Sequence, residues 1–435
     1  MSIHSPAHPA LPTGAPLALK RLSRMIGLAL LWAVALLAPV LATLVVALLP
    51  IGTAVPAPIW IVLGLADLAL IVALFWLRWA ARAAGVAIGG ALIVALLAAV
   101  ASQAFAATPP IVDAQGQPIP NSIATLEQVT LNGTKQWITI RGKDAGNPVL
   151  LNLGMGGPGG GGFATRGLFE PLEEHFVVVS WDEPGTGKSY GAVPISTLTP
   201  QRFVADAHAL TLLLRERFHQ DKIYIYGVSW TSILGIWLAQ QYPDLYYAYV
   251  GNGQMVNTTE NDVMGYRLAL SYLGERGDTA AAEVLRRNGP PPYREGDVTG
   301  KYLAFLDVLN DYMGAPRYAL IAPIVPVFAP EYGLVDKVNH TRGLIDSFAV
   351  VYPQLSDLDF TTQARTLEVP VYFLTGRNDV NAMSSLVERY YGVLQAPHKE
   401  LIWLEGGHGL SGSNLGQFVD VMVNKVLKQT YPDQP

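Results

Sequence analysis

Residues 222–241, KIYIYGVSWTSILGIWLAQQ, constrain the fold of this chain more than any other stretch of its sequence. The alternating β-branched and aromatic residues of Lys222–Tyr226 predict a short buried strand, and the Leu/Ile/Trp pattern of Ile233–Gln241 predicts a helix. The chain must reverse direction in the GVSWT segment between them. A serine in so sharp a strand-to-helix turn, here Ser229, has its hydroxyl raised above the sheet. The N–H of Trp230 points to the same space, at a helix N-terminus that favours negative charge.

The turn matches the G-x-S-x-G pattern of serine nucleophiles except at its last position, where Thr231 replaces glycine. The alternative is an ordinary strand–turn–helix in which Ser229 only caps the helix, because serine is a common cap residue. The segment alone does not decide between the two, so the partners that a serine nucleophile needs must be found elsewhere in the chain.

The composition narrows the classes of function. The chain has 435 residues, 51% of them hydrophobic, which is enough for a full core and a membrane part. The absence of cysteine excludes disulfides, a thiol nucleophile and a cysteine-ligated metal, and we expect neither a metal nor a cofactor. Residues 1–110 hold five basic residues and one acid, which leaves 24 basic and 33 acidic residues for the remainder. An acidic globular part without a basic run argues against nucleic acid as a partner.

Three long apolar stretches stand near the N-terminus, Met25–Leu49, Pro58–Leu77 and Ala84–Ala107, and Asp67 is the one charged residue within them. Each is long enough to cross a hydrocarbon core of roughly 30 Å at about 1.5 Å per residue. We therefore predict three transmembrane helices within residues 25–107, preceded by a disordered cytoplasmic tail over residues 1–24. Asp67 is interpreted as a hydrogen-bond partner inside the helix bundle, with a part in a transport pathway as the alternative.

Basic residues set the expected orientation of these helices. Lys20, Arg21 and Arg24 precede the first helix, and Arg78 and Arg82 follow the second. Cytoplasmic loops carry the excess of Lys and Arg, so the part after the third helix is expected outside the cytoplasm, in a multi-pass protein of the cell membrane. Residues 103–110, QAFAATPP, resemble a signal-peptide cleavage site, but two preceding spans argue against a removable signal.

After a Pro/Gly/Gln-rich linker at residues 108–123, strands and helices alternate. The expected strands are Leu126–Leu131, Gln136–Arg141, Pro148–Leu153, His175–Trp181, Lys222–Tyr226, Tyr246–Gly251, Val369–Thr375 and Glu400–Leu404. A hairpin around Asn132-Gly133 followed by β–α alternation predicts an α/β fold with a mostly parallel sheet covered on both faces. We assign residues 124–252 and 363–435 to this core. Residues 253–362 lack strand patterns and are expected to form a helical cap over the carboxyl edge of the sheet.

A glycine-rich segment, Asn152–Gly162, directly follows the third expected strand. So many glycines let the backbone approach a reacting carbonyl and direct N–H groups at it. The N–H groups of Gly157 and Trp230 are the expected pair of oxyanion donors. A flexible surface linker is the alternative, although such a linker seldom begins at the end of a buried strand.

Residues 182–189, DEPGTGKS, imitate a phosphate-binding loop. The G-x-x-x-x-G-K-[ST] pattern requires glycine where this chain has Asp182, and it must open a helix. Here the segment is followed by YGAVP, which does not begin a helix. We therefore expect a structural loop beside the site, and no nucleotide.

A general base and an acid that orients it are expected at other strand ends. His408 lies in EGGHG just after the last strand, and Asp379 follows the strand before it in TGRND. Four other histidines precede strands or fall in or beside helices: His175, His208, His219 and His398. The chain order Ser229, Asp379, His408 is that of the α/β hydrolases. Three such positions at strand ends predict a catalytic triad.

These motifs together resemble the α/β hydrolases of the proline iminopeptidase type, over about residues 124–428. More narrowly, the chain is similar to a bacterial group with membrane spans ahead of the catalytic domain. The resemblance rests on the segments MGGPG at 155–159, WDEPGTGKS at 181–189, GVSWT at 227–231, GRND at 376–379 and GH at 407–408. Met155 stands where the family has histidine, and Thr231 where it has a small residue. Both departures bear on substrate range, and Met155 is included among the expected substrate-binding residues.

The resemblance implies a function and an amine-binding site. It implies a serine hydrolase that cleaves an N-terminal residue from short peptides or a related amide. In the family, acids of the cap region hold the substrate amine, which implies this role for Glu260, with Asp262 beside it. A cap on the helix start is the alternative for Glu260. A carboxylesterase or lipase with the same triad, and a non-catalytic membrane sensor on a hydrolase fold, are the competing functions. The expected partners are a small peptide or ester substrate and the lipid bilayer.

Overall fold

The computed structural model describes residues 15–76 and 81–432. The chain divides into two compact units. The first, here called the helical unit, comprises Met1–Ile51 and Val55–Ala104, and the second, here called the sheet unit, comprises Gly52–Ala54 and Phe105–Pro435.

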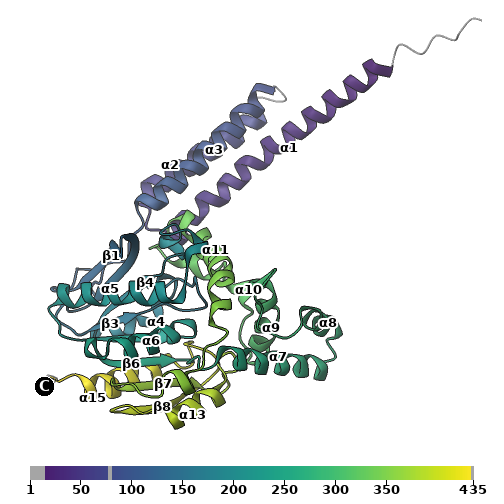
Figure 1. The fold of residues 1–435 in the computed structure, drawn as a ribbon. Coiled ribbons are helices and arrows are strands. Elements are labelled where there is room, and N and C mark those ends of the chain that lie inside the picture. The colour runs from purple at the N-terminus through teal and green to yellow at the C-terminus, as the bar shows by residue number, and fades with distance from the viewer. Residues whose placement is uncertain (1–14, 77–80, 433–435) are drawn as a thin grey trace, which may run out of the picture. The chain divides into compact units, whose positions relative to one another are not determined.

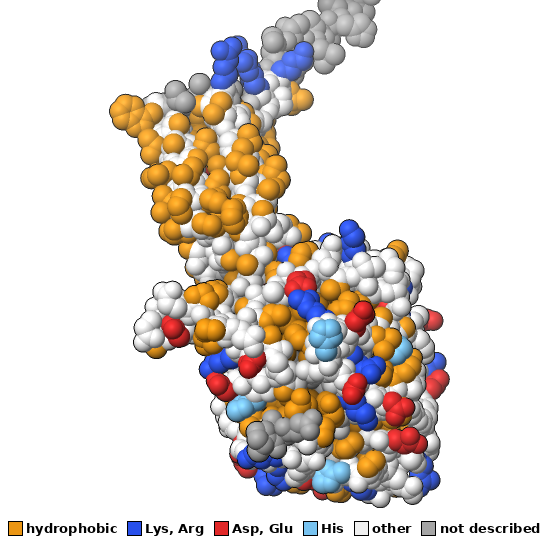
Figure 2. Space-filling model, turned by 90° about the vertical axis from the view of Figure 1, so that its left-hand side faces the viewer, with side chains coloured by type: hydrophobic (Ala, Val, Ile, Leu, Met, Phe, Trp, Pro, Cys, Tyr) orange, Lys and Arg blue, Asp and Glu red, His pale blue; other side chains and the backbone are white. Residues whose placement is uncertain are grey.

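The helical unit consists of three helices, α1 (Ala15–Gly52), α2 (Ala57–Trp76) and α3 (Ala81–Ala104). All three are long and apolar enough to cross a membrane. Figure 2 shows hydrophobic side chains spread over these helices, with Lys and Arg side chains gathered at one end. The tail expected over residues 1–24 is helical from Ala15 on, because Ala, Leu, Lys and Arg favour helices. Residues 1–14, and the expected cytoplasmic Arg78, lie outside the described residues.

Small residues and a polar pair help to hold the helices of the helical unit together. Ala35, Ala84 and Ala87 are buried between the helices, where small side chains let the backbones approach closely. Asp67 on α2 is buried and accepts a hydrogen bond from Thr43 Oγ1 on α1. This confirms the interpretation of Asp67 as a hydrogen-bond partner within the bundle.

The sheet unit is built on one eight-stranded sheet with the order β1-β2-β4-β3-β5-β6-β7-β8. The strands are β1 (Ile123–Leu131), β2 (Thr134–Gly142), β3 (Val149–Asn152), β4 (Val177–Asp182), β5 (Ile223–Val228), β6 (Tyr246–Asn252), β7 (Val371–Gly376) and β8 (Lys399–Leu404). β2 pairs antiparallel with β1 and β4, and all later pairs are parallel. The β1–β2 turn places Asn132 and Gly133 at positive φ, as the expected hairpin requires. The predicted fold class is confirmed.

Side chains alternate between the two faces of this sheet. On β5, Ile223 and Ile225 pack in one buried cluster, and Tyr224 and Tyr226 pack in another on the opposite face. The first cluster includes residues of α5 (Pro200–Phe218), α6 (Trp230–Gln241) and α13 (Ser384–Val393). The second includes residues of α4 (Arg166–Phe169), η2 (Glu170–Glu174), α14 (Leu415–Asp420) and the π-helix η8 (Val421–Leu427). Helices on both faces leave the carboxyl edge of the strands free for a site (Figure 1).

The segment between β6 and β7 forms a helical cap. Its elements are α7 (Thr258–Glu275), α8 (Thr279–Asn288), α9 (Val298–Tyr312), α10 (Tyr318–Ile321), η6 (Val325–Phe328), α11 (Leu334–Val351), η7 (Tyr352–Leu355) and α12 (Phe360–Gln363). A separate apolar cluster around Tyr302 and Phe305 holds α7, α8 and α9 together. The cap therefore has a core of its own and contributes side chains to the space above the sheet.

Candidate active site

Ser229 occupies the turn between β5 and α6 in a conformation that side chains seldom adopt. Its φ is 56° and its ψ is −121°, and a non-glycine residue at positive φ is uncommon. Hydrogen bonds on both sides hold this strained backbone. The N–H of Ser229 donates to Asn252 O at 3.0 Å, and its carbonyl accepts from the N–H and the hydroxyl of Ser232 at 3.0 and 2.5 Å. Strain maintained in this way is typical of functional positions.

Thr231 gives the turn a link that glycine could not provide. Its hydroxyl is buried, accepts a hydrogen bond from Val228 N at 2.9 Å and donates toward Gly154 O at 2.9 Å. Gly154 belongs to the glycine-rich segment that follows β3. The departure from the family pattern thus joins the serine turn to that segment.

His408 and Asp379 lie against each other at the carboxyl ends of β8 and β7. Nδ1 of His408 is 2.8 Å from Oδ2 of Asp379, and both side chains are buried. Burial lowers the pKa of His408, but the charge and hydrogen bond of Asp379 raise it further, so the pKa lies above its ordinary value. The imidazole is thus held in one orientation and made a stronger base.

Backbone groups hold Asp379 in turn. Its Oδ1 accepts from the N–H of Asn381 at 3.0 Å and of Ala382 at 2.9 Å. The loop that carries these groups is bound to the cap, since Asn261 Nδ2 donates to Asn381 O at 2.8 Å and Asn261 Oδ1 accepts from Met383 N at 2.8 Å. Asn261 therefore connects the first helix of the cap to the carboxylate that orients His408.

Gly253, directly after β6, makes room for the His–Asp pair. Its φ is +52°, and a Cβ there would lie 2.8 Å from His408 Cε1 and 3.2 Å from Asp379 Oδ2. Both distances are shorter than ordinary van der Waals contact. A side chain at this position would displace the pair, so the site depends on glycine here.

The glycine-rich segment is buried and held in place, unlike a surface linker. Glu183, fully buried after β4, accepts a backbone hydrogen bond from Gly159 and lies 3.3 Å from Nε1 of Trp230. Burial raises the pKa of Glu183 well above its ordinary value, although these two hydrogen bonds lower it. Glu183 thus binds both the segment of Gly157 and the residue after the serine, the two expected sources of oxyanion donors.

A cavity of about 330 Å³ brings most of the expected residues together. Ser229, His408, Gly157 and Trp230 line it, along with Asp262. The remaining lining is mainly apolar and comes from the cap, including Leu303, Leu306, Ala322, Pro323, Leu344 and Phe348. The arrangement places a serine, a histidine and two candidate donor groups in the wall of one mainly apolar pocket.

Asp262 is the carboxylate of the cap that lies in this cavity. It is buried and accepts hydrogen bonds from the hydroxyls of Tyr352, at 3.0 Å, and Tyr302. Burial raises the pKa of Asp262 to about 7, although the tyrosine hydroxyls lower it. A cation that entered the cavity would find a nearly dry carboxylate there.

The structure places Glu260 and Met155 elsewhere. Glu260 forms a two-pronged ion pair with Arg389 on α13, its side chain is 39% exposed, and it is not among the residues that line the cavity. Its N–H is capped by Asn257, the N-cap of α7. Met155 packs against the apolar cluster on the α4 side of the sheet. The geometry therefore favours Asp262 over Glu260 as a group that meets substrate.

The DEPGTGKS segment has the structural role expected of it. Asp182 ends β4 and accepts hydrogen bonds from Tyr332 OH at 2.8 Å and from the N–H of Lys188 at 3.0 Å. Lys188 Nζ pairs with Asp336 Oδ2 at 2.9 Å. The lysine is thus engaged with the cap, and the segment itself ends in a short 3₁₀ turn, η3 (Gly187–Ser189).

Sequence patterns did not point to four residues that shape the site: Gly253, Asn261, Tyr302 and Tyr352. The two tyrosines lie on different cap elements and meet Asp262 only through packing. Gly253 carried a weak signal, because a glycine directly after a parallel strand suits a close approach at the sheet edge.

Comparisons with known proteins agree with this architecture. Residues 147–304 match the family model described as alpha/beta hydrolase fold. The chain is 30% identical over 296 residues to "Probable aminopeptidase YbaC" of Bacillus subtilis (strain 168), an alignment that covers 66% of this chain and 91% of that protein. It is 32% identical over 112 residues to a "Probable proline iminopeptidase" of Leptolyngbya boryana, which covers 24% of this chain and 32% of that protein.

A solved structure shows the same fold. The proline iminopeptidase-related protein of Thermus thermophilus superposes with a TM-score of 0.50 at 18% identity, covering 71% of this chain and 99% of that one. The predicted resemblance and the predicted class of enzyme are confirmed. The chain belongs to the α/β hydrolases of the proline iminopeptidase type.

Proposed function

We propose that this protein is a membrane-anchored serine hydrolase that removes the N-terminal residue from short peptides or cleaves a related amide. The observation that carries the proposal is that Ser229, at positive φ, and His408 line the same cavity. Nδ1 of His408 is in turn 2.8 Å from Asp379 Oδ2. A binding protein has no use for a serine at positive φ together with an oriented and activated imidazole.

In the proposed reaction, His408 takes the proton of the Ser229 hydroxyl as the oxygen attacks the substrate carbonyl. Asp379 holds the proton on Nδ1 and stabilises the imidazolium that forms. The N–H groups of Gly157 and Trp230 stabilise the negative oxygen of the tetrahedral intermediate. His408 then gives its proton to the leaving amine, and water attacks the acyl-enzyme by the same route to regenerate Ser229.

Asp262 supplies the preference for a free amine. A protonated N-terminus in an apolar cavity needs a carboxylate partner, because an unpaired charge there is costly. Asp262 lines the same cavity as Ser229, whereas Glu260 is paired with Arg389. The aminopeptidase named among the relatives supports this choice of substrate class.

The helical unit supports the proposed membrane anchoring. Three helices long and apolar enough to cross a membrane precede the sheet unit, and exposing such surfaces to water would be unfavourable. The basic residues before α1 favour a cytoplasmic N-terminus, and three spans then lead to a catalytic part outside the cytoplasm.

A second candidate is an esterase that acts on acyl esters. The apolar cap residues that line the cavity, Leu303, Leu306 and Leu344 among them, favour it because an acyl chain would be buried there. Ser229, His408 and Asp379 would act in the same way on an ester.

The test uses the full chain and a fluorophosphonate that labels activated serines. We expect labelling of the wild type, and a loss of turnover on the order of 10⁴ in Ser229→Ala, His408→Ala and the double variant alike, because the residues act as a unit. Aminoacyl-arylamides and short-chain esters are then compared by kcat/KM, and higher values for the arylamides support the aminopeptidase. Normal turnover in a folded Ser229→Ala variant would remove the mechanism, and higher values for the esters would favour the second candidate.

A further inference from the structure

Exposed apolar side chains gather on one part of the cap. Among the described residues after Phe105, ten large apolar side chains are exposed, and six of them lie between Leu320 and Ile345. We call this set the cap apolar surface: Leu320, Ile324, Phe328, Val335, Val338 and Ile345. Such clustering is unusual on a surface that meets only water, and it marks an interaction site.

The segment of α10 and η6 is apolar on two opposite sides. Leu320, Ile324 and Phe328 are 64%, 55% and 64% exposed and follow one another at four-residue spacing. Ala322 and Pro323, from the other side, line the active-site cavity. A helix that only covers a cavity in water would present a polar outer face. The outer face here is apolar as well.

The helix α11 repeats this pattern beside it. Val335 and Val338 are exposed, whereas Thr341 and Leu344 line the cavity. Ile345 is 49% exposed and also borders the cavity. Buried Lys337 joins α11 to η6, because its Nζ donates to Pro326 O at 3.0 Å and Ala329 O at 2.7 Å. The two elements therefore form one wall with the cavity behind it.

The linker that leaves the helical unit is bound next to this wall. Ala107 N donates to Pro330 O at 3.3 Å, and Thr108 Oγ1 donates to Glu331 Oε1 at 2.8 Å. Gly52, the last residue of α1 and itself part of the sheet unit, lies against this wall too, since a Cβ there would lie 1.7 Å from Val327 O. Phe328 thus directly follows Val327, which lies against Gly52, and precedes Pro330, which accepts from Ala107, by two residues.

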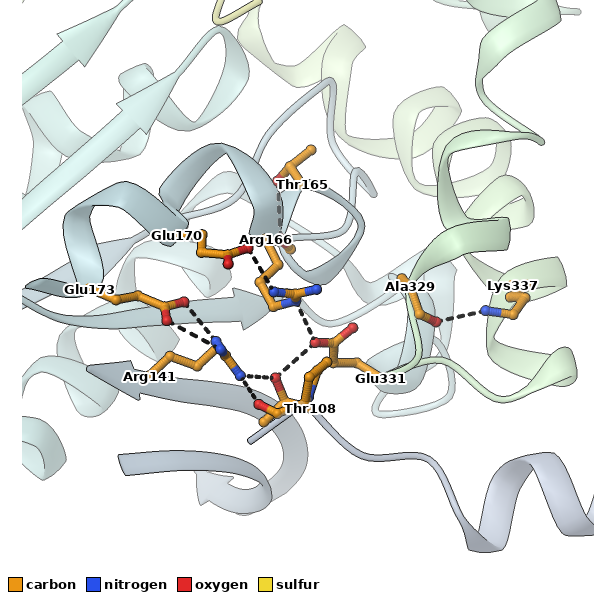
Figure 3. Close-up of polar contacts among 11 residues, drawn as sticks. Thr108, Arg141, Thr165, Arg166, Glu170, Glu173, Ala329, Glu331 and Lys337 are labelled. Atoms are coloured by element: carbon orange, nitrogen blue, oxygen red, sulfur yellow. Dashed lines mark hydrogen bonds and ion pairs between the residues drawn. The ribbon is translucent and has the colours of Figure 1, made fainter. Parts of the chain in front are cut away.

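Buried ion pairs fix the linker at this place. Arg141 on β2 donates to Thr108 Oγ1 and to Pro109 O, and it pairs with Glu173 at 2.7 Å (Figure 3). Arg166 pairs with Glu331 at 3.0 Å. From Ala104, the last residue of α3, the chain reaches Ala107 within roughly 10 Å even when fully extended. The linker that follows α3 is therefore held close to Phe328 within the sheet unit.

We propose that the cap apolar surface docks into the interfacial layer of the bilayer in which α1–α3 are anchored. The proposal rests on the membrane anchoring in the proposed function, and not on its choice of substrate. Burial of the six side chains in the lipid interface removes apolar area from water, and exposed Arg317 at the start of α10 suits anionic headgroups. Docking places the wall of the active-site cavity against lipid.

The chain lacks cysteine, so single-cysteine variants can report on this surface. The full chain carrying Ile324→Cys, Phe328→Cys or Val338→Cys is labelled with an environment-sensitive fluorophore and reconstituted in phosphatidylcholine–phosphatidylglycerol vesicles. Leu212→Cys on α5 and Val284→Cys on α8 are matched controls, because both positions are exposed in the same unit. Val62→Cys, on the exposed side of α2, reports the membrane span itself. Labelling of Ser229 by a fluorophosphonate shows that each variant is folded.

We expect labels at positions 324, 328 and 338 to shift to shorter emission wavelength and to be quenched by nitroxide-bearing lipids, as the label at 62 is. Labels at 212 and 284 should respond to aqueous iodide instead. If nitroxide-bearing lipids quench the label at 62 while the cap labels respond to iodide like the controls, docking is overturned and membrane anchoring is retained. A label at 62 without lipid quenching would overturn the anchor and docking together. Disulfide cross-links between two Phe328→Cys chains, without lipid quenching, would assign the surface to a second copy and overturn docking.

Discussion

At the scale of single residues, we expect the direction in which a side chain points to decide which acid of the cap meets a substrate. Glu260 and Asp262 are two residues apart on α7, which turns their side chains by about 200° around the helix axis. Asp262 therefore faces the cavity and two tyrosine hydroxyls, while Glu260 faces Arg389 on the outer side. Glu260 and Asp262 follow the end of β6 at Asn252 by only 8 and 10 residues, so proximity in sequence alone does not distinguish them.

We expect Asp262→Asn to raise KM for aminoacyl-arylamides by about 10-fold, the value of roughly one charge-assisted hydrogen bond. Simple esters lack the amine, so their KM should stay near the wild-type value. Glu260→Gln is the matched control and should leave both substrate types unchanged. Steady-state kinetics on the two substrates checks this. An increase in KM for arylamides in Glu260→Gln, with none in Asp262→Asn, would exchange the roles of the two acids.

The pH dependence should separate the roles of Asp262 and His408. Only the ionised carboxylate of Asp262 binds a cation, and its pKa in the free enzyme is raised to about 7. KM for arylamides should therefore rise as the pH falls below about 7, whereas KM for esters should stay flat. His408 must be neutral to accept a proton and has a raised pKa, so kcat for both substrates should fall as acid protonates it. A flat KM profile for arylamides would argue against Asp262.

At the scale of elements, the ends of four parallel strands meet at the site. Ser229 follows β5, Gly253 follows β6, Asp379 follows β7 and His408 follows β8. The strands pair in register, with Val228 opposite Asn252 and Asn252 opposite Leu374, so their carboxyl ends form one edge. β6 lies between the strands that carry Ser229 and Asp379, and the glycine that follows it, Gly253, leaves the space for the His–Asp pair.

Gly253→Ala should reduce kcat by on the order of 100-fold while the fold survives, because the new Cβ displaces the imidazole from its working geometry. Gly274→Ala is the control, since a Cβ there meets nothing within 4 Å at the end of α7. That variant should keep its activity. Circular dichroism and kcat on one arylamide test both variants. Unchanged kcat in Gly253→Ala would mean that the pair tolerates the displacement.

At the scale of the whole molecule, the chain segment between the first two apolar helices bears on the membrane topology. This segment, Gly52–Ala54, comprises the last residue of α1 and the start of the turn to α2, and it belongs to the same compact unit as the sheet and cap. We therefore expect that turn and the catalytic part on the same side of the membrane, as the proposed sidedness requires.

A reporter fused after Pro435 should be active only if the catalytic part lies outside the cytoplasm. We expect alkaline phosphatase activity, which requires export, from this fusion, and none from a fusion placed after the second span. A cytoplasmic reporter such as green fluorescent protein should show the reverse. Fluorescence with no phosphatase activity at Pro435 would mean that one of the three helices does not cross the membrane.

Much of the fold could be predicted from local sequence. Alternating apolar residues, the Asn132-Gly133 turn and the capping of α5 by Thr199 are all present in the structure, because local sterics and solvent exposure decide backbone conformation. The three apolar stretches appear as helices for the same reason. Ser229, Asp379 and His408 could be proposed from order and spacing, since parallel strands end at one edge of a sheet.

Tertiary structure decided what those residues meet. Thr231 bonds Gly154, 77 positions away, and Asp262 bonds Tyr352, 90 positions away. Met155 packs against the apolar cluster on the α4 side of the sheet, and the linker after α3 is bound to the cap. The spacing of apolar residues along the chain determines which face of a helix or strand is apolar, because side chains return to the same face with the period of that element. Which distant element covers that face depends on packing between elements, and no local pattern records it.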